Sequence, residues 1–391
     1  MADILKEGWN DTKSALMEGL QGSKAKVMET VLENTKRYLA EQSTAGATSA
    51  GNVATLNRVI LPVIRRVMPT VIANEIVGVQ PMTGPVGQIH TLRVRYADTS
   101  SGAGTTAGEE ALSPFKIASS YAGNETSGTP KAASTATLEG TAGKRLSIQI
   151  LKQPVEAKSR KLSARWTFES AQDAQSQQGI DIEAEIMAAL AQEITAEIDQ
   201  EILASLRSLP GSASETYNQA NVSGTATFVG DEHAALAVQV NRVANQIATR
   251  TRRGAGNYAV VSPTALTILQ SATTSAFARS TEGTFEAPTN TKFVGTLNNS
   301  MRVYVDAYAS DNTSVLVGYK GSSEADAPAF YCPYIPLMSS GVVLDPATFE
   351  PVVSFLTRYG YVELTNTASS LGNAADYVGL VAINSTNLKF S

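Results

Sequence analysis

The feature that most constrains the fold of this chain is a regular apolar stripe in the middle of the sequence. Isoleucine or leucine recurs every four residues, at Ile182, Ile186, Leu190, Ile194, Ile198, Ile202 and Leu206. This spacing predicts one long helix, with Asp181 placed to cap its start and Pro210 and Gly211 placed to end it. Because four residues exceed one turn of about 3.6, the stripe drifts around the axis and meets different neighbours along its length. We therefore expect the helix to act as a spine.

Other periodic segments predict a mixture of helices and strands. A second helix is expected from Glu232 to about Arg250, and Ser262 followed by Pro263 marks the capped start of a third. Strands are predicted at Gln88 to Tyr96, Leu146 to Ile150, Leu162 to Phe168, Tyr258 to Val261, Arg302 to Asp306, Val315 to Tyr319 and Val352 to Tyr361. The expected fold class is therefore α+β.

A long stretch of small and polar residues, Ala97 to Gly143, interrupts the predicted strands. A compact domain seldom carries so long a loop without structure unless the loop has a function. We expect a two-stranded excursion with a flexible tip, in which the alternating segments at Leu146 to Ile150 and Leu162 to Phe168 form the returning side.

The N-terminal region shows a weaker helical pattern. Apolar residues from Ile4 to Leu39 recur at loosely helical spacing, and Gly19 and Gly22 weaken a continuous helix. This predicts an amphipathic arm that bends or is ordered by a neighbouring molecule. A Ser/Thr/Ala/Gly-rich linker, Gln42 to Asn52, follows the arm.

Composition limits the partners of the chain. Its 391 residues are 43% hydrophobic, enough for a substantial core, but only 17% are charged, which predicts a weakly polar surface suited to contact with other subunits. The net charge of -5 disfavours dedicated nucleic-acid recognition. Two basic groups are expected to pair with carboxylates more readily than with phosphate: Lys158, Arg160, Lys161 and Arg165, and Arg250, Arg252 and Arg253. No signal peptide or membrane span is expected.

No assembled set of catalytic or metal-binding residues is visible. The only histidines, His90 and His233, and the only cysteine, Cys332, are interpreted as structural. Gly140 to Arg145 lacks the first glycine and the final Ser/Thr of a phosphate-binding loop. The spine carboxylates are expected on a solvated or interfacial face: Glu185, Glu193, Glu197 and Glu201. We expect no enzyme activity, no cofactor and no metal.

Three blocks of sequence resemble the T-even phage major capsid protein family. The first is Val79 to Ile89 (VQPMTGPVGQI), and the second is Val155 to Leu162 (VEAKSRKL) continuing through Glu169 to Asp173 (ESAQD). The third comprises Phe293 to Leu297 (FVGTL), Arg302 to Asp306 (RVYVD), Val317 to Gly321 (VGYKG), Tyr331 to Tyr334 (YCPY) and Thr357 to Gly360 (TRYG). In this order the blocks extend over most of the chain from Val79 to Tyr361.

The resemblance implies a Hong Kong 97-type capsid fold and a shell-building role. The implied organisation is an N-terminal arm (1–53), a connection (54–87), an extended β-hairpin loop (88–165), the spine helix of a peripheral domain (166–211), an axial domain (212–330) and a return to the peripheral domain (331–391). Copies would assemble in the host cytoplasm as hexamers and pentamers of a virion shell around double-stranded DNA, with vertex, scaffold, portal and decoration proteins as partners. A pentamer-forming vertex protein or an encapsulin-like compartment shell of the same fold are the alternatives.

Two departures from the family are visible. Longer members carry an insertion domain in the extended loop, whereas Ala97 to Gly143 is too short and polar to predict one. Members are also trimmed by a maturation protease after a Leu/Ile-x-Glu sequence, which Leu39-Ala40-Glu41 matches, although Gln42 is bulkier than the small residue expected next. Glu41 is the candidate cleavage site.

Overall fold

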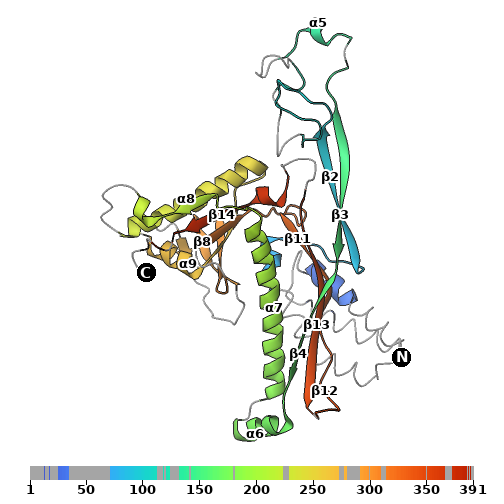
Figure 1. The fold of residues 1–391 in the computed structure, drawn as a ribbon, viewed down its shortest axis with the longest axis vertical. Helices are drawn as coiled ribbons and strands as arrows, with labels where there is room; N and C mark the ends of the chain where they lie inside the picture. The colour runs from blue at the N-terminus through green and yellow to red at the C-terminus, as the bar shows by residue number, and fades with distance from the viewer. Residues whose placement is uncertain are drawn as a thin grey trace.

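The structure is a computed structural model that describes residues 13, 17, 25–34, 71–111, 118, 120–123, 132–140, 142–178, 181–222, 229–272, 277–279, 291–298, 300–309, 314–348, 350–365, 372–384, 386 and 388. A hairpin of β2 (Val86–Tyr96) and β3 (Leu146–Glu156) projects from the body at one end of the long axis. Helix α6 (Phe168–Gln178) and β12 (Val343–Leu344) lie at the opposite end (Figure 1).

The predicted spine is present as α7 (Ile182–Ser208). Asp181 caps it as predicted, because its side chain accepts a hydrogen bond from the backbone N–H of Glu183 at 3.1 Å. Every residue of the apolar stripe from Leu190 onward is buried, whereas Ile182 and Ile186 are only partly covered. The C-terminal part of α7 therefore crosses the core, whereas its first turns lie at the surface.

A seven-stranded mixed sheet forms one side of the body. Its strands, in spatial order, are β5 (Glu215–Tyr217), β14 (Val378–Ile383), β10 (Ser314–Gly318), β6 (Tyr258–Val261), β9 (Met301–Asp306), β8 (Thr291–Leu297) and β7 (Phe277–Arg279). Helices α8 (Val229–Thr251) and α9 (Pro263–Ser271) share a buried apolar cluster with this sheet. Ser262 caps α9 as predicted, accepting a hydrogen bond from Ala265 N at 3.3 Å. Two short 3₁₀ helices, Gln219–Asn221 and Ala374–Tyr377, adjoin β5 and β14.

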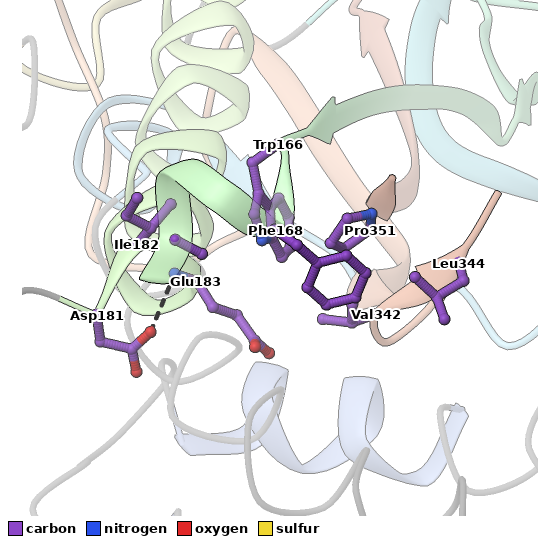
Figure 2. A pocket seen from close by; sticks show the side chains of 9 residues that line it. Trp166, Phe168, Asp181, Ile182, Glu183, Val342, Leu344 and Pro351 are labelled. Atoms are coloured by element: carbon purple, nitrogen blue, oxygen red, sulfur yellow. Dashed lines mark hydrogen bonds between the residues drawn. The ribbon is translucent and has the colours of Figure 1, made fainter. Parts of the chain in front are cut away.

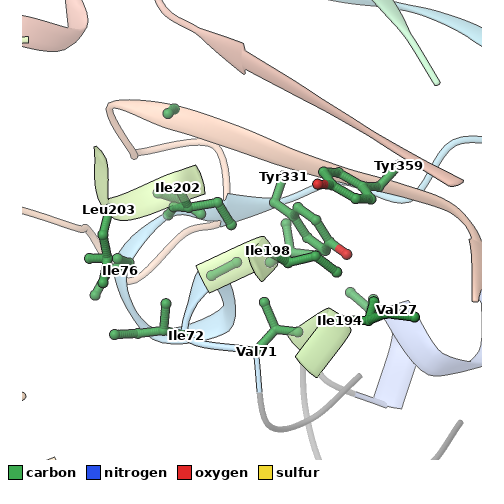
Figure 3. Packing of buried hydrophobic residues seen from close by; sticks show 14 of the residues in the cluster. Val27, Val71, Ile72, Ile76, Ile194, Ile198, Ile202, Leu203, Tyr331 and Tyr359 are labelled. Carbon is green, nitrogen blue, oxygen red and sulfur yellow. The ribbon is translucent and has the colours of Figure 1, made fainter. Parts of the chain in front are cut away.

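A second sheet runs alongside α7. It is built around β13 (Pro351–Glu363), which pairs with β4 (Lys158–Arg165), β11 (Ala329–Ser339) and β12, while β1 (Gly78–Val79) pairs with β11. The short helix α4 (Ala73–Ile76) precedes β1. Helix α7, both sheets and the residues around α4 contribute to the largest apolar cluster, part of which Figure 3 shows. The mixture of helices and strands confirms the α+β prediction.

One strand lies in a different sheet from the one expected. The alternation at Leu162 to Phe168 predicts the returning side of the excursion, but β4 pairs with β13, and Phe168 begins α6. Period-two alternation predicts a strand without specifying its long-range partner. Within the region 331–391, β14 pairs with β10 and β5 in the seven-stranded sheet.

The tip of the excursion is more structured than expected. Within Ala97 to Gly143 the described residues include two isolated bridges, Arg95 with Glu110 and Ser100 with Thr105, and the short helix α5 (Thr135–Leu138). Of the predicted N-terminal arm, residues 25–34 form a helix that packs in the core of the same chain. Most of the remaining arm, including Glu41, lies outside the described residues.

Candidate assembly surfaces

One face of the β2–β3 hairpin presents apolar side chains to solvent. Leu92 lies opposite Ile150 in the antiparallel register, and Val94 lies opposite Ile148. Leu92, Ile148 and Ile150 are 68%, 71% and 60% exposed. A two-stranded ribbon is marginally stable by itself, and a contiguous apolar strip in water marks a site of contact with another surface.

The other face of the hairpin is fastened to the body by a buried arginine. Arg93 donates a hydrogen bond to the carbonyl oxygen of Gly372 at 2.9 Å and pairs with the Glu110 carboxylate at 3.3 Å. Arg93 and Glu110 are 5% and 8% exposed, so the ion pair is shielded from solvent. Nearer the base, Gln153 donates to the carbonyl oxygen of Glu363 at 3.1 Å. These contacts fix the direction in which the apolar face points.

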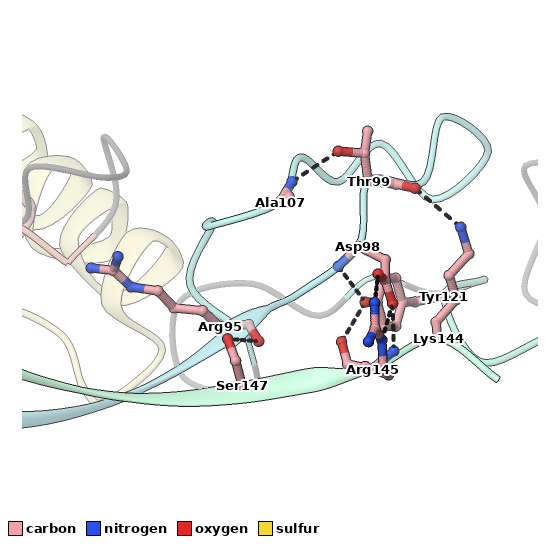
Figure 4. A network of polar contacts seen from close by, with 8 residues as sticks. All are labelled: Arg95, Asp98, Thr99, Ala107, Tyr121, Lys144, Arg145 and Ser147. Atoms are coloured by element: carbon pink, nitrogen blue, oxygen red, sulfur yellow. Dashed lines mark hydrogen bonds and ion pairs between the residues drawn. The ribbon is translucent and has the colours of Figure 1, made fainter. Parts of the chain in front are cut away.

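The tip of the hairpin carries a small folded knob, defined here as residues 96–111, 118, 120–123 and 142–145. Tyr96 and Tyr121 pack with their ring centroids 4.6 Å apart, and Ala111 is buried with them. The Tyr121 hydroxyl donates to the carbonyl oxygen of Arg145 at 2.6 Å. Asp98 closes the knob by accepting hydrogen bonds from Arg145, which hold the pKa of Asp98 below its usual range (Figure 4).

A second exposed apolar patch lies at the opposite end of the molecule. Phe168, Val342, Val343 and Leu344 are between 41% and 57% exposed. Phe168, Val342 and Leu344 also line a pocket of about 430 Å³ with Trp166 and Pro351, and Asp181 and Glu183 contribute to the lining (Figure 2). The hairpin face and this patch are therefore different surfaces at opposite ends of the molecule (Figure 1).

The spine is tied to the second sheet by a polar network. Arg160 of β4 donates to the carboxylates of Glu197 and Glu201, each at 2.5 Å, and to the Tyr359 hydroxyl of β13. Tyr359 in turn donates to Glu201. Arginines of both basic groups identified in the sequence pair with carboxylates, as predicted. Arg160 pairs with Glu197, Arg165 with Glu350, and Arg253 with Asp326.

A buried acidic joint connects the spine to the seven-stranded sheet. Asp306, at the end of β9, accepts a hydrogen bond from the Gln200 side chain at 2.7 Å and lies 3.2 Å from Arg207. Nearby, Asp199 accepts a hydrogen bond from Ile72 N at 2.9 Å. Burial, reinforced by the charge of Asp306, raises the pKa of Asp199 to about 7. This joint was not predicted from the sequence, because Asp199 belongs to no motif and the RVYVD block that ends in Asp306 does not indicate what that carboxylate contacts.

The candidate chemical residues are dispersed. His90 stands on the exposed face of β2, whereas buried His233 contacts Ser271. Cys332 is buried in the second sheet, and burial raises the pKa of its thiol to about 12. The described residues contain no cluster of histidine, cysteine and acidic side chains suited to a metal, and no helix among them is long and apolar enough to cross a membrane.

The sequence matches the family model of the major capsid protein Gp23 over residues 53–383. The major capsid protein of Vibrio phage KVP40 is 29% identical and covers 95% of this chain and 96% of its own length. That of Enterobacteria phage T4 is 30% identical over 83% of this chain and 78% of its own length.

A solved structure from Mycobacterium phage Bobi (15% identity, TM-score 0.47) and the capsid of Myoviridae phage XM1 (12% identity, TM-score 0.44) are also similar. They cover 81% and 79% of this chain, and 90% of each of those chains is covered. The family model spans most of the sequence, including every block that carried the resemblance. The chain therefore belongs to the Gp23 family of major capsid proteins, structural proteins that form the head shell of tailed phages.

Proposed function

We propose that copies of this chain join head to tail into hexamers, and into pentamers at the corners of the shell, with the β2–β3 hairpin of each subunit lying over its neighbour. The observation that carries this proposal is the exposed apolar face of the hairpin around Leu92, Ile148 and Ile150. A contact between two different surfaces of one subunit generates a ring when its rotation closes. Repetition of the same modest contact then stabilises the shell.

The patch formed by Phe168 and residues 342–344 is the surface we assign to the receiving subunit. It lies at the end of the molecule opposite the hairpin. It also combines apolar side chains with the carboxylates of Asp181 and Glu183, whereas the hairpin face carries Lys152. Burial of the apolar groups would supply affinity, and the opposite charges would fix the direction of docking.

The remaining partners follow from the same shell role. Packaged double-stranded DNA would be contacted without sequence specificity, since the net charge is -5 and several arginines are already paired. Vertex, scaffold, portal and decoration proteins would complete the particle, and Glu41 is the proposed site of trimming. The subunit would divide at the residue boundaries given above, with β4 and β14 reassigned to the sheets in which they pair.

The test is to express the full chain, alone and with its neighbouring phage genes, and to examine the products by negative-stain electron microscopy and mass photometry. Closed shells or hexamers are expected. The double substitution Ile148→Ser and Ile150→Ser should prevent them, because it removes most of the exposed apolar face. Gln149→Ser is the matched control, since Gln149 lies between the two isoleucines on the opposite face of the strand.

The possible outcomes separate the alternatives. A compact monomer under both conditions would contradict assembly. Pentamers alone would support a vertex protein, and shells that enclose an enzyme instead of DNA would support a compartment protein. If the isoleucine variant assembles as well as the glutamine control, the hairpin face is not the contact.

A further inference from the structure

We propose that copies of this chain make a second, electrostatic contact, in which a basic face of β4 in one copy lies against an acidic stripe on α7 of another copy. The basic face is defined by Lys161 and Arg165, and the acidic stripe by Glu185 and Glu193. The inference rests on the proposed assembly of copies into a shell. Both surfaces differ from the apolar face of the hairpin, so the contact can be tested separately.

The basic group of β4 is divided between the two faces of its sheet. Arg160 points toward α7, where it pairs with Glu197 and Glu201. Because successive side chains of a strand point to opposite faces, Lys161 and Arg165 lie on the face turned away from Arg160. The carboxylates of the spine therefore neutralise only one side of this basic group.

The cations on the outer face of β4 are poorly neutralised within the chain. Lys161 is exposed, and no carboxylate in the described part of the chain pairs with it. Arg165 is 65% exposed, and its ion pair with Glu350 is long, at 3.8 Å. Arg358 of β13, on the same face, stacks over the ring of Tyr334 at 5.3 Å from the ring centroid. The sheet therefore presents a positively charged face to solvent.

The first half of α7 carries the complementary charge. Glu185 and Glu193 are exposed, and neither forms an ion pair within the residues that the structure describes. They lie just over two turns apart, so their side chains project from the same half of the helix. Exposed Glu169 and Asp173 of the adjoining helix α6 add further negative charge near the start of α7.

The spacing of the charges on the two surfaces agrees. Lys161 and Arg165 lie about 13 Å apart along a strand that rises about 3.3 Å per residue. Glu185 and Glu193 lie about 12 Å apart along a helix that rises about 1.5 Å per residue. Two ion pairs can therefore form at the same time, which matters because a single exposed ion pair contributes little.

A second copy fits the basic face better than the phosphate backbone of DNA does. The net charge of the chain is -5, so its overall field repels a polyanion. Every copy, in contrast, brings one acidic stripe for each basic face, and a contact between two different surfaces can be repeated around a closed assembly. Complementary charge would also select which surfaces of two copies meet.

Two charge-reversed chains test the contact. The first carries Lys161→Glu and Arg165→Glu, and the second carries Glu185→Lys and Glu193→Lys. Each chain alone brings like charges together, so the assembled fraction measured by mass photometry should fall at least about tenfold. An equal mixture should recover assembly, because each chain then meets a neighbour of opposite charge at both surfaces. Both variants keep a negative net charge, so general attraction between them does not explain the recovery.

The matched control is Arg250→Glu with Arg252→Glu, which makes the same change in net charge at exposed arginines of the other basic group. Circular dichroism and the unfolding temperature verify the fold of each variant before mixing. Full assembly of either reversed chain alone, or no recovery on mixing, would overturn this contact and leave the hairpin contact untouched.

Two further outcomes identify other causes. If the first variant forms shells with the neighbouring phage genes but retains less DNA than the control, the basic face contacts phosphate, which overturns the proposal. If the unsubstituted chain does not assemble, the proposed function fails, and this contact fails with it.

Discussion

Asp199 couples the stability of the subunit to pH. Its carboxylate is 1% exposed, and burial raises its pKa to about 7, well above the ordinary value of 3.8. A group whose pKa is higher in the folded state binds its proton more tightly there, so the stabilisation is complete below pH 3.8 and is lost as pH rises to about 7. The free energy of unfolding should fall by up to roughly 4 kcal/mol across this window.

Asp199→Asn should remove this dependence. The amide oxygen can still accept the hydrogen bond from Ile72 N, but the side chain no longer ionises. Urea unfolding at pH 5 and pH 8 measures the change, with Glu193→Gln on the exposed side of the same helix as the control. If the free energy of unfolding of Asp199→Asn still falls between pH 5 and pH 8 as in the unsubstituted protein, another group causes the pH dependence.

Single residues at helix ends were predictable from the sequence, whereas buried charges were not. Asp181 and Ser262 each combine a capping side chain with a clear helix start, and both cap as expected. Asp199 follows Ile198 of the stripe, where the sequence pattern gives no reason to bury a carboxylate. Asp199 belongs to a second buried row beside the stripe, with Ala191, Thr195 and Leu203, so the buried face of α7 is wider than the stripe itself.

Among the elements, the hairpin depends on its contact with the loop at Gly372. Arg93→Met should remove the bond to the Gly372 carbonyl and leave buried Glu110 without its ion pair. We expect faster amide hydrogen exchange throughout β2 and β3, measured by mass spectrometry. Lys152→Met, on the exposed face, is the control and should leave exchange unchanged.

Gly372→Ala should also speed amide hydrogen exchange in β2 and β3. Gly372 has φ +78°, which disfavours any side chain, and an added Cβ would lie 2.2 Å from an Arg93 nitrogen. The substitution therefore displaces Arg93 while leaving its charge in place. A hairpin that exchanges normally in Gly372→Ala would indicate that Glu110 alone holds Arg93.

Elements with local signals were predicted, and elements defined by distant pairing were not. The spine and β6 match their expected ranges closely, because the spine is marked by its periodicity and stop residues, and β6 is a short apolar run that ends at the helix start Ser262-Pro263. Strand β11 was missed because Pro333 and Pro336 interrupt it, and its register with β13 shifts between Pro333 and Ile335. The knob was missed because its core depends on Tyr96 meeting Tyr121 across a glycine-rich stretch.

At the scale of the whole molecule, the acidic joint connects α7 to the seven-stranded sheet. Arg207→Ala would leave Asp306, which is 0% exposed, without its ion pair, at an expected cost of about 3–5 kcal/mol in the free energy of unfolding. Arg242→Ala removes an exposed partner of Glu215 and should cost at most about 1 kcal/mol. Denaturant unfolding of both variants checks the comparison, and equal losses would contradict it.

The order of hairpin, spine and sheets along the chain could be predicted from the sequence blocks. The places where the two end regions of the chain pack could not be predicted. Strand β14 enters the seven-stranded sheet from the C-terminal region, and helix 25–34 enters the core from the N-terminal region. Both placements rest on contacts between residues distant in the sequence: Val381 pairs with Glu215, and the Asn34 side chain donates to the Tyr334 carbonyl oxygen. No local pattern encodes such contacts, since burial selects apolar residues without specifying their partners.

The length of the hairpin gives it a mechanical property. Strands β2 and β3 each contain 11 residues, and at about 3.3 Å per residue the ribbon extends roughly 36 Å. Arg93 lies three residues, or about 10 Å, from Tyr96 at the start of the knob, so a tilt of about 10° about the Arg93 contact moves the knob by roughly 2 Å. Such a tilt would displace the folded knob without changing its internal contacts, because the end of the hairpin would move as a unit about the Arg93 contact.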